Sequence, residues 1–213
     1  MEKVFALIYS TVLESHSLLL LKYFSDVKIL DATTISLPDQ VADDYAGMGG
    51  RNDKAALKTQ TLYSAISHSI TYFNVTSGVT HDTLILPEII ETLSEKELFL
   101  ADLGYFDTSH LQKIGEKNYF FSRIKTNLHL FHAISERYSI YEQLDVSNIL
   151  RKSGDSIDQE VYIGADTHSK LKVRLVGTKL PDEVAHKRIK RLLHKMMAMI
   201  LVLVNVKYYI GIL

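Results

Sequence analysis

Two aspartates stand in sequence contexts where a carboxylate is suited to chemistry. Asp31 lies within the strand-like run Val-Lys-Ile-Leu-Asp-Ala-Thr-Thr, and Asp102 ends the apolar run Leu-Phe-Leu-Ala-Asp. Acidic side chains are rarely buried unless they are paired or bind a metal. Two carboxylates that share a site both stay ionised when a cation lies between them, and Mg²⁺ is the usual choice. The alternative for Asp102 is a turn cap, because Gly104 follows closely.

Charge is distributed unevenly along the chain, although the formal net charge is −1. Residues 1–110 contain 7 Lys/Arg and 15 Asp/Glu, a balance of −8, whereas residues 111–213 contain 17 and 10, a balance of +7. This division suggests that the acidic half holds metal and the basic half faces phosphate. Uneven surface charge without a functional meaning is the alternative.

A basic segment at 186–195 is expected to be helical and suited to contact with DNA phosphates, with a solvated helix face as the alternative. The residues predicted to bind DNA are Lys187, Arg188, Lys190 and Arg191. A second basic set follows Asp102 and could line the same groove: Lys113, Lys117, Arg123 and Lys125. The aromatic residues nearby are expected to be core rather than stacking platforms: Tyr105, Tyr119, Phe120 and Phe121.

Composition excludes several classes of protein. The chain has no cysteine, which rules out a disulfide scaffold, a thiolate zinc site, an iron–sulfur cluster and a cysteine nucleophile. Its 213 residues are enough for one sizeable domain. No targeting segment is evident, and the apolar run 196–204 is shorter than a membrane-spanning helix requires. We therefore expect a cytoplasmic protein that does not span a membrane.

The elements that must position the two aspartates follow from hydrophobic periodicity and turn residues. Asp31 is predicted to lie on the first strand and Asp102 at the end of a short buried strand. The predicted strands are 28–37, 55–67, 69–80, 97–102 and 118–124, and the predicted helices are 2–24, 83–93, 108–117 and 182–195. Residues 128–180 are expected to hold irregular structure and short strands. The pattern predicts an α/β fold in which helices cover a mixed sheet.

Three motifs resemble those of DDE transposases of the bacterial insertion-sequence "type four" family. They are Asp-Ala-Thr-Thr-Ile-Ser-Leu-Pro at 31–38, Lys58 in Ala-Leu-Lys-Thr-Gln, and Ala-Asp-Leu-Gly-Tyr-Phe at 101–106. The resemblance extends over about residues 1–190. It implies an RNase H-like mixed sheet of about five strands, with the first aspartate on strand one and the second at the end of strand four. It also implies a β-rich insertion after strand five, which residues 128–180 fit.

By this resemblance, Asp31 and Asp102 are the first two catalytic metal ligands. The cofactor is then Mg²⁺, for which Mn²⁺ can substitute. The implied partners are DNA, both transposon ends and target, and a second copy of the chain in a homodimer. The implied reaction is DNA transposition by metal-dependent strand cleavage and strand transfer.

The third acid of the family has no match in the chain. The family pattern Tyr-x2-Arg-x3-Glu-x6-Lys is absent, and neither Glu142, Glu160 nor the Asp182-Glu183 pair has the surrounding residues. We therefore expect a fragment truncated at both ends, with absent or very low cleavage activity. The alternative is a non-enzymatic transposase remnant that binds DNA weakly and without sequence preference.

Four segments are predicted from these patterns. They are an N-terminal helical segment (1–27), the first part of the RNase H-like core (28–127), a β-rich insertion (128–180), and a helix with an atypical apolar tail (181–213). Residues 196–213 are almost wholly apolar. A reading-frame shift near His194–Met196 would explain that change of character, and a terminal strand or helix packed on the sheet is the alternative.

Overall fold

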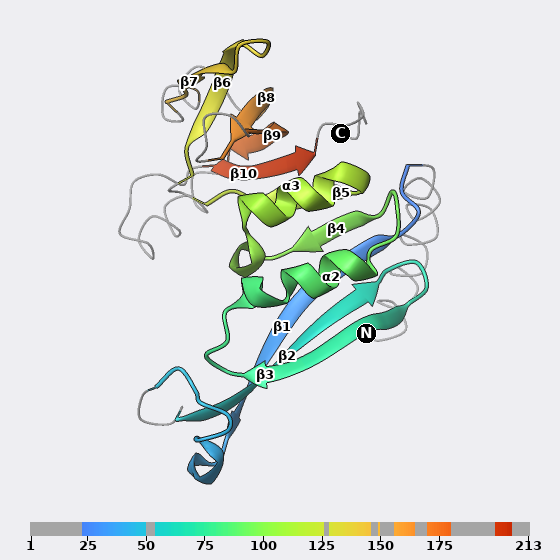
Figure 1. Ribbon diagram of the computed structural model, residues 1–213, viewed down its shortest axis with the longest axis vertical. Coiled ribbons are helices and arrows are strands. Elements are labelled where there is room, and N and C mark those ends of the chain that lie inside the picture. The colour runs from blue at the N-terminus through green and yellow to red at the C-terminus, as the bar shows by residue number, and fades with distance from the viewer. Residues whose placement is uncertain are drawn as a thin grey trace. The chain divides into compact units, whose positions relative to one another are not determined.

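The chain forms two compact units in the computed structural model. The first is Met1–Leu100 and the second is Ala101–Leu213. The residues that the structure describes are 23–49, 54–125, 128–145, 149, 156–164, 170–179 and 199–205. Figure 1 shows the strands and helices of each unit. None of the helices within these ranges is long and apolar enough to cross a membrane.

An antiparallel meander of three strands opens the first unit: β1 (Val27–Leu37), β2 (Ala55–Ser64) and β3 (Ser69–Ser77). Their sequences are rich in Thr, Ile, Val and Tyr, which suit a pleated and half-buried surface. The β1–β2 register runs from Lys28 opposite Ser64 to Leu37 opposite Ala55. The meander confirms the three consecutive strands predicted from the sequence.

The short strand β4 (Leu98–Ala101) lies beside β1, so the order in the first unit is β3-β2-β1-β4. Two backbone hydrogen bonds connect the residues at the start of β1 with those at the start of β4. Ser25 N–H donates to Lys96 O and Leu98 N–H donates to Asp26 O, both at 2.9 Å. The bonded positions advance in the same direction along both segments, so β1 and β4 run parallel. The sheet is therefore mixed, as the sequence predicted.

Helix α2 (Leu86–Thr92) supplies the core on one face of the meander. A 3₁₀ turn at Asp82–Ile85 leads into the helix, which has a proline in its first turn. The Tyr72 hydroxyl on β3 donates to the Glu88 carboxylate on α2. The side chains buried in this unit include Leu30, Leu62, Leu86, Ile89 and Phe99. Alternate residues of β1 point away from this core, and Ile29, Asp31, Thr33 and Ile35 are exposed.

The second unit begins with a 3₁₀ turn at Leu103–Tyr105, helix α3 (Thr108–Lys117) and strand β5 (Tyr119–Arg123). Asp107 caps α3, because its Oδ1 accepts from the backbone N–H groups of Ser109 and His110, each at 3.0 Å. Leu111 and Ile114 of the helix and Phe120 of β5 are buried. Helix and strand agree with the sequence prediction to within one residue at each end.

A run of antiparallel strands completes the second unit: β6 (Leu130–Ser135), β7 (Ile140–Gln143), β8 (Ser156–Ile163), β9 (Leu171–Lys179) and β10 (Met199–Asn205). Their order, starting from β5, is β5-β10-β9-β8-β6-β7. Residues 128–180 are thus more regular than the sequence indicated. Strand β10 comes from the apolar tail and pairs with both β5 and β9. This pairing agrees with the alternative in which the tail forms a terminal strand of the sheet. The predicted helices at 2–24 and 182–195 lie outside the described residues.

Candidate metal centre

Asp31 is the fifth residue of β1 and lies opposite Thr61 of β2. Its neighbour Leu30 is 2% exposed and packs into the core, whereas Asp31 itself is exposed. The alternation of a strand therefore places the carboxylate on the face that α2 does not cover. The sequence suggested a buried acid in the sheet centre. The strand is central, but its outward face is open to solvent at this position.

Asp102 directly follows β4 and begins the 3₁₀ turn at Leu103–Tyr105. Its backbone carbonyl accepts from Tyr105 N–H at 3.0 Å, while its side chain makes no capping hydrogen bond. The turn is therefore compatible with a role for the carboxylate as a metal ligand, because the hydrogen bond from Tyr105 N–H that closes the turn uses the backbone carbonyl of Asp102. That carboxylate is 59% exposed and accepts a hydrogen bond from the Arg123 guanidinium.

Arg123 lowers the pKa of Asp102. The hydrogen bond from its guanidinium is the main reason why the pKa of the Asp102 carboxyl lies below its usual value. An aspartate with an ordinary pKa is already ionised at neutral pH, as a metal ligand must be, and the lowered pKa extends that ionisation to more acidic solutions. The ion pair is exposed on both sides, so it adds little to stability and a competing cation can replace the guanidinium.

The two aspartates belong to different units, Asp31 to the first and Asp102 to the second. The distance between their carboxylates stays a prediction. Within the described part of the chain, no group of three or more His, Asp or Glu side chains is placed to hold a metal ion. A carboxylate-only pair has the hard oxygen ligands that Mg²⁺ and Mn²⁺ prefer, so the chemistry of the donors fits the implied cofactor.

The predicted DNA-binding residues Lys187, Arg188, Lys190 and Arg191 lie outside the described residues. Of the second basic set, Arg123 pairs with Asp102, and Lys125 Nζ donates to Phe106 O at 3.0 Å. Lys113 and Lys117 are exposed on α3.

The aromatic residues divide between core and surface. Tyr105 and Phe120 are buried, as expected, at 3% and 0% exposed. Phe121 is 44% exposed, which corrects its placement in the core, because alternate residues of β5 face outward.

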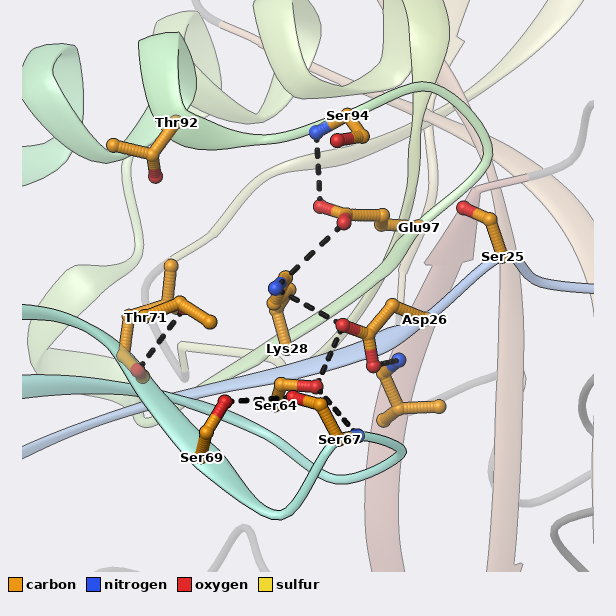
Figure 2. Close-up of polar contacts among 12 residues, drawn as sticks. Ser25, Asp26, Lys28, Ser64, Ser67, Ser69, Thr71, Thr92, Ser94 and Glu97 are labelled. Atoms are coloured by element: carbon orange, nitrogen blue, oxygen red, sulfur yellow. Dashed lines mark hydrogen bonds and ion pairs between the residues drawn. The ribbon is translucent and has the colours of Figure 1, made fainter.

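Sequence reasoning missed a buried polar cluster made of Asp26, Lys28, Ser64 and Glu97. Figure 2 shows the Lys28 ammonium between the carboxylates of Asp26 and Glu97. Its Nζ lies 3.0 Å from Asp26 Oδ2 and 3.7 Å from Glu97 Oε1. The Ser64 hydroxyl donates to Asp26 Oδ2 at 2.7 Å. The signal that could have revealed it was Lys28, which lies on an apolar strand two positions after Asp26, because residues two apart in an extended chain share a face.

Comparison with known proteins identifies the class. Residues 22–196 match the family described as the transposase DDE domain. That match covers most of the chain, so the chain belongs to this family. The family and the mixed sheet of the first unit confirm the expected RNase H-like α/β fold.

Individual relatives agree with the family. The chain is 30% identical over 190 residues to the transposase for insertion sequence element IS231F of Bacillus thuringiensis subsp. israelensis, covering 83% of this chain and 39% of the relative. It is 29% identical over 181 residues to the transposase for IS1151 of Clostridium perfringens, covering 78% and 38%. The chain thus spans about two fifths of the length of these relatives.

Among solved structures, a piggyBac transposase synaptic complex with hairpin DNA is similar at a TM-score of 0.49 and 10% identity, and the match covers 88% of this chain and 34% of that chain.

Proposed function

We propose that Asp31 and Asp102 form a divalent-cation site for DNA strand cleavage and strand transfer during transposition. The observation that carries this proposal is the parallel pairing of β1 and β4. Leu98 N–H donates to Asp26 O. In a parallel pair, this hydrogen bond places Leu98 opposite Val27, the residue that follows Asp26. Four further residues along both segments lead to Asp31 and Asp102. If the pairing continues without a bulge, the two aspartates lie opposite each other.

Opposite residues on neighbouring strands point to the same face, and the strands are about 4.8 Å apart. Both acids follow this pattern, since each is exposed. Their carboxylates are then expected roughly 4–8 Å apart, close enough to share one cation with ligand distances near 2.1 Å. Mg²⁺ is the proposed cofactor, with Mn²⁺ as a substitute. A bound cation of this kind supplies charge neutralisation and an activated oxygen nucleophile at a phosphodiester.

The protein residues have separate roles in this proposal. Asp31 and Asp102 supply the ligands, and the Arg123 guanidinium occupies the Asp102 carboxylate until a cation replaces it. The basic residues Lys187, Arg188, Lys190 and Arg191 hold DNA through its phosphates, without reading sequence. The proposed partners are transposon ends, target DNA and a second copy of the chain. A cytoplasmic location is part of the proposal, because the family acts on DNA.

We further propose that this 213-residue chain has absent or very low cleavage activity by itself. The chain has no match to the family pattern that carries the third acid, so a second cation would be poorly held. The rival function is non-enzymatic DNA binding by a transposase remnant. Both proposals share the fold and differ in whether the two aspartates hold a cation.

A cleavage assay on duplexes that carry insertion-sequence ends tests the function. The chain is incubated with Mg²⁺ or Mn²⁺ beside the Asp31→Asn and Asp102→Asn variants. Weak cleavage that disappears in both variants supports the two-acid site. Cleavage that persists in both variants contradicts the assignment of the aspartates, and strong cleavage contradicts the proposed low activity. Cation binding that is lost in both variants, without any cleavage, favours the two-acid site over the rival.

A further inference from the structure

The cluster of Asp26, Lys28 and Glu97 lies at the beginning of the same two parallel segments that lead to the aspartates. Lys28 is 9% exposed, Asp26 15% and Glu97 5%. Three charged side chains are thus largely removed from water, which costs free energy that their mutual attraction only partly offsets. In some proteins, buried ionic groups of this kind specify one alignment of the chain.

Further hydrogen bonds hold the cluster in place from both sides. Asp26 accepts from its own neighbour Val27 N–H at 2.7 Å and from Ser64, which in turn accepts from Ser67 N–H at 3.0 Å. Glu97 accepts from Ser94 N–H at 3.0 Å. Burial opposes ionisation of Asp26, but these donors and Lys28 hold the pKa of its carboxyl below the usual value. Burial raises the pKa of Glu97, which Lys28 only partly counters.

The cluster penalises any slip between the two segments. The bond from Leu98 N–H to Asp26 O places Asp26 opposite Glu97, with Lys28 two residues further along the chain on the same face. A slip of one residue would turn Glu97 to the opposite face, away from Lys28. A slip of two residues would move it by about 6.6 Å, beyond the reach of an ion pair. Either slip would also separate Asp31 from the position opposite Asp102.

We propose that Lys28 is a positioning residue: by bridging Asp26 and Glu97, it fixes the parallel register of β1 against β4 and thereby the alignment of Asp31 with Asp102. This inference rests on the proposed function, because the aligned aspartates are the proposed cation site. Lys28 lies on the core side of β1 and Asp31 on the open side, so Lys28 acts through the strand and not through contact with a ligand.

A triple variant, Asp26→Asn/Lys28→Met/Glu97→Gln, tests the inference without leaving an unpaired charge in the core. The matched control is Lys58→Met/Asp82→Asn. Lys58 is also largely buried and ion-paired in the first unit, with Nζ 2.9 Å from Asp82 and 2.6 Å from Thr80 O, but it lies on β2 and contacts neither β1 nor β4 through its ammonium. If the triple variant does not fold, Glu97→Gln replaces it, because that change keeps the Lys28–Asp26 pair.

Two measurements are made on each folded variant. Hydrogen exchange at the Leu98 amide, which donates to Asp26 O, reports the pairing directly and should be about tenfold faster in the triple variant. Mn²⁺ affinity, measured by electron paramagnetic resonance with the metal alone, should fall about tenfold or more. The control should leave both quantities within about twofold of the original chain.

Equal losses in the triple variant and the control would overturn the inference, because they would reflect general destabilisation. Unchanged Leu98 exchange and Mn²⁺ affinity in the triple variant would overturn it as well. Failure of the proposed function is distinguishable: Asp31→Asn in the otherwise unaltered chain would then leave Mn²⁺ affinity unchanged. In that case the link to a cation site is overturned, and Leu98 exchange alone decides whether Lys28 sets the register.

Discussion

Arg123 competes with any cation for the Asp102 carboxylate. Arg123→Gln removes the positive charge, so the pKa of Asp102 should rise toward its usual value while the carboxylate stays ionised at pH 7. Mn²⁺ should then bind a few-fold more tightly, because no guanidinium must be displaced. Carboxyl NMR titration gives the pKa, and an Mn²⁺ titration at pH 7 gives the affinity. Weaker Mn²⁺ binding in the variant would show that Arg123 supports the site.

The same substitution should change stability very little. Asp102 has a lowered pKa in the folded chain, so its contribution is present above the usual pKa and is lost as the pH falls through the folded value. Both side chains are 59% exposed, and solvent screening reduces the contribution to less than about 1 kcal/mol. Urea unfolding at pH 7 provides the check.

Glu97 gives stability the opposite pH dependence. Its folded pKa is raised by burial from a reference value of 4.5, so the folded chain favours the protonated form. The stabilisation is therefore complete below about pH 4.5 and is lost as the pH rises through the folded pKa. Each unit of pKa shift corresponds to about 1.4 kcal/mol. Relative to Glu97→Gln, the original chain should lose unfolding free energy between pH 4.5 and 7.

Urea unfolding of both proteins at the two pH values measures this difference. Asp26 and Lys28 face Glu97 in the cluster, and both remain in the variant, so the comparison isolates the Glu97 titration. Parallel pH profiles for the two proteins would contradict a raised Glu97 pKa in the folded chain.

At the scale of elements, Gly78 directly follows β3 and packs against Ala56 near the start of β2. A Cβ at Gly78 would lie 2.7 Å from Ala56 Cβ and 3.2 Å from Ala56 O. Gly78 N–H also donates to Ala56 O at 2.8 Å, so the backbone cannot easily move away. Gly78→Ala should therefore cost about 1–3 kcal/mol of unfolding free energy, as overpacking does.

The double variant Ala56→Gly/Gly78→Ala separates this contact from a general effect of the substitution. Removing the Ala56 methyl relieves the closest contact, so part of the lost stability should return in thermal unfolding. No recovery would mean that the strain arises elsewhere.

Strong local patterns made several elements predictable. Strand β1, helix α3 with its Asp107 cap, and strand β5 have clear periodicity or capping residues and were placed within one residue. The meander was predictable because β-branched residues alternate between turns. Strand β10 could not be predicted from the sequence, because a continuous apolar run fits a strand, a helix or an unselected tail equally well. Its pairing partners β5 and β9 are distant in sequence.

The candidate site was predictable in part for similar reasons. The motifs around Asp31 and Asp102 are local, and both lie on the predicted elements. The partner Arg123 was only one of the four basic residues predicted beyond Asp102, since the ion pair joins residues that lie 21 positions apart in the sequence. The Asp26–Lys28–Glu97 cluster was missed because Glu97 is 69 residues from Lys28, and only the parallel register brings them together.

At the scale of the whole molecule, DNA binding should depend steeply on salt and little on sequence. The second half carries a balance of +7, and phosphate contacts release counterions while carrying no base information. Lys187→Ala/Arg188→Ala should weaken binding equally for all sequences and reduce the salt slope by about 2. Fluorescence anisotropy at several salt concentrations measures both.

The matched control is Lys54→Ala/Arg137→Ala, which removes the same charge from exposed positions elsewhere. It should leave the affinity near that of the original chain. An equal loss in both variants would mean that net charge alone, and not the segment 186–195, governs binding.

The central claim is that Asp31 and Asp102 hold one divalent cation between them. The most direct measurement is anomalous scattering at the manganese edge from crystals of the chain soaked in Mn²⁺. The account predicts one peak about 2.1 Å from a carboxylate oxygen of each aspartate, with the Arg123 guanidinium displaced from Asp102. A peak that contacts only one of the two aspartates, or well-ordered carboxylates with no peak between them, would contradict it.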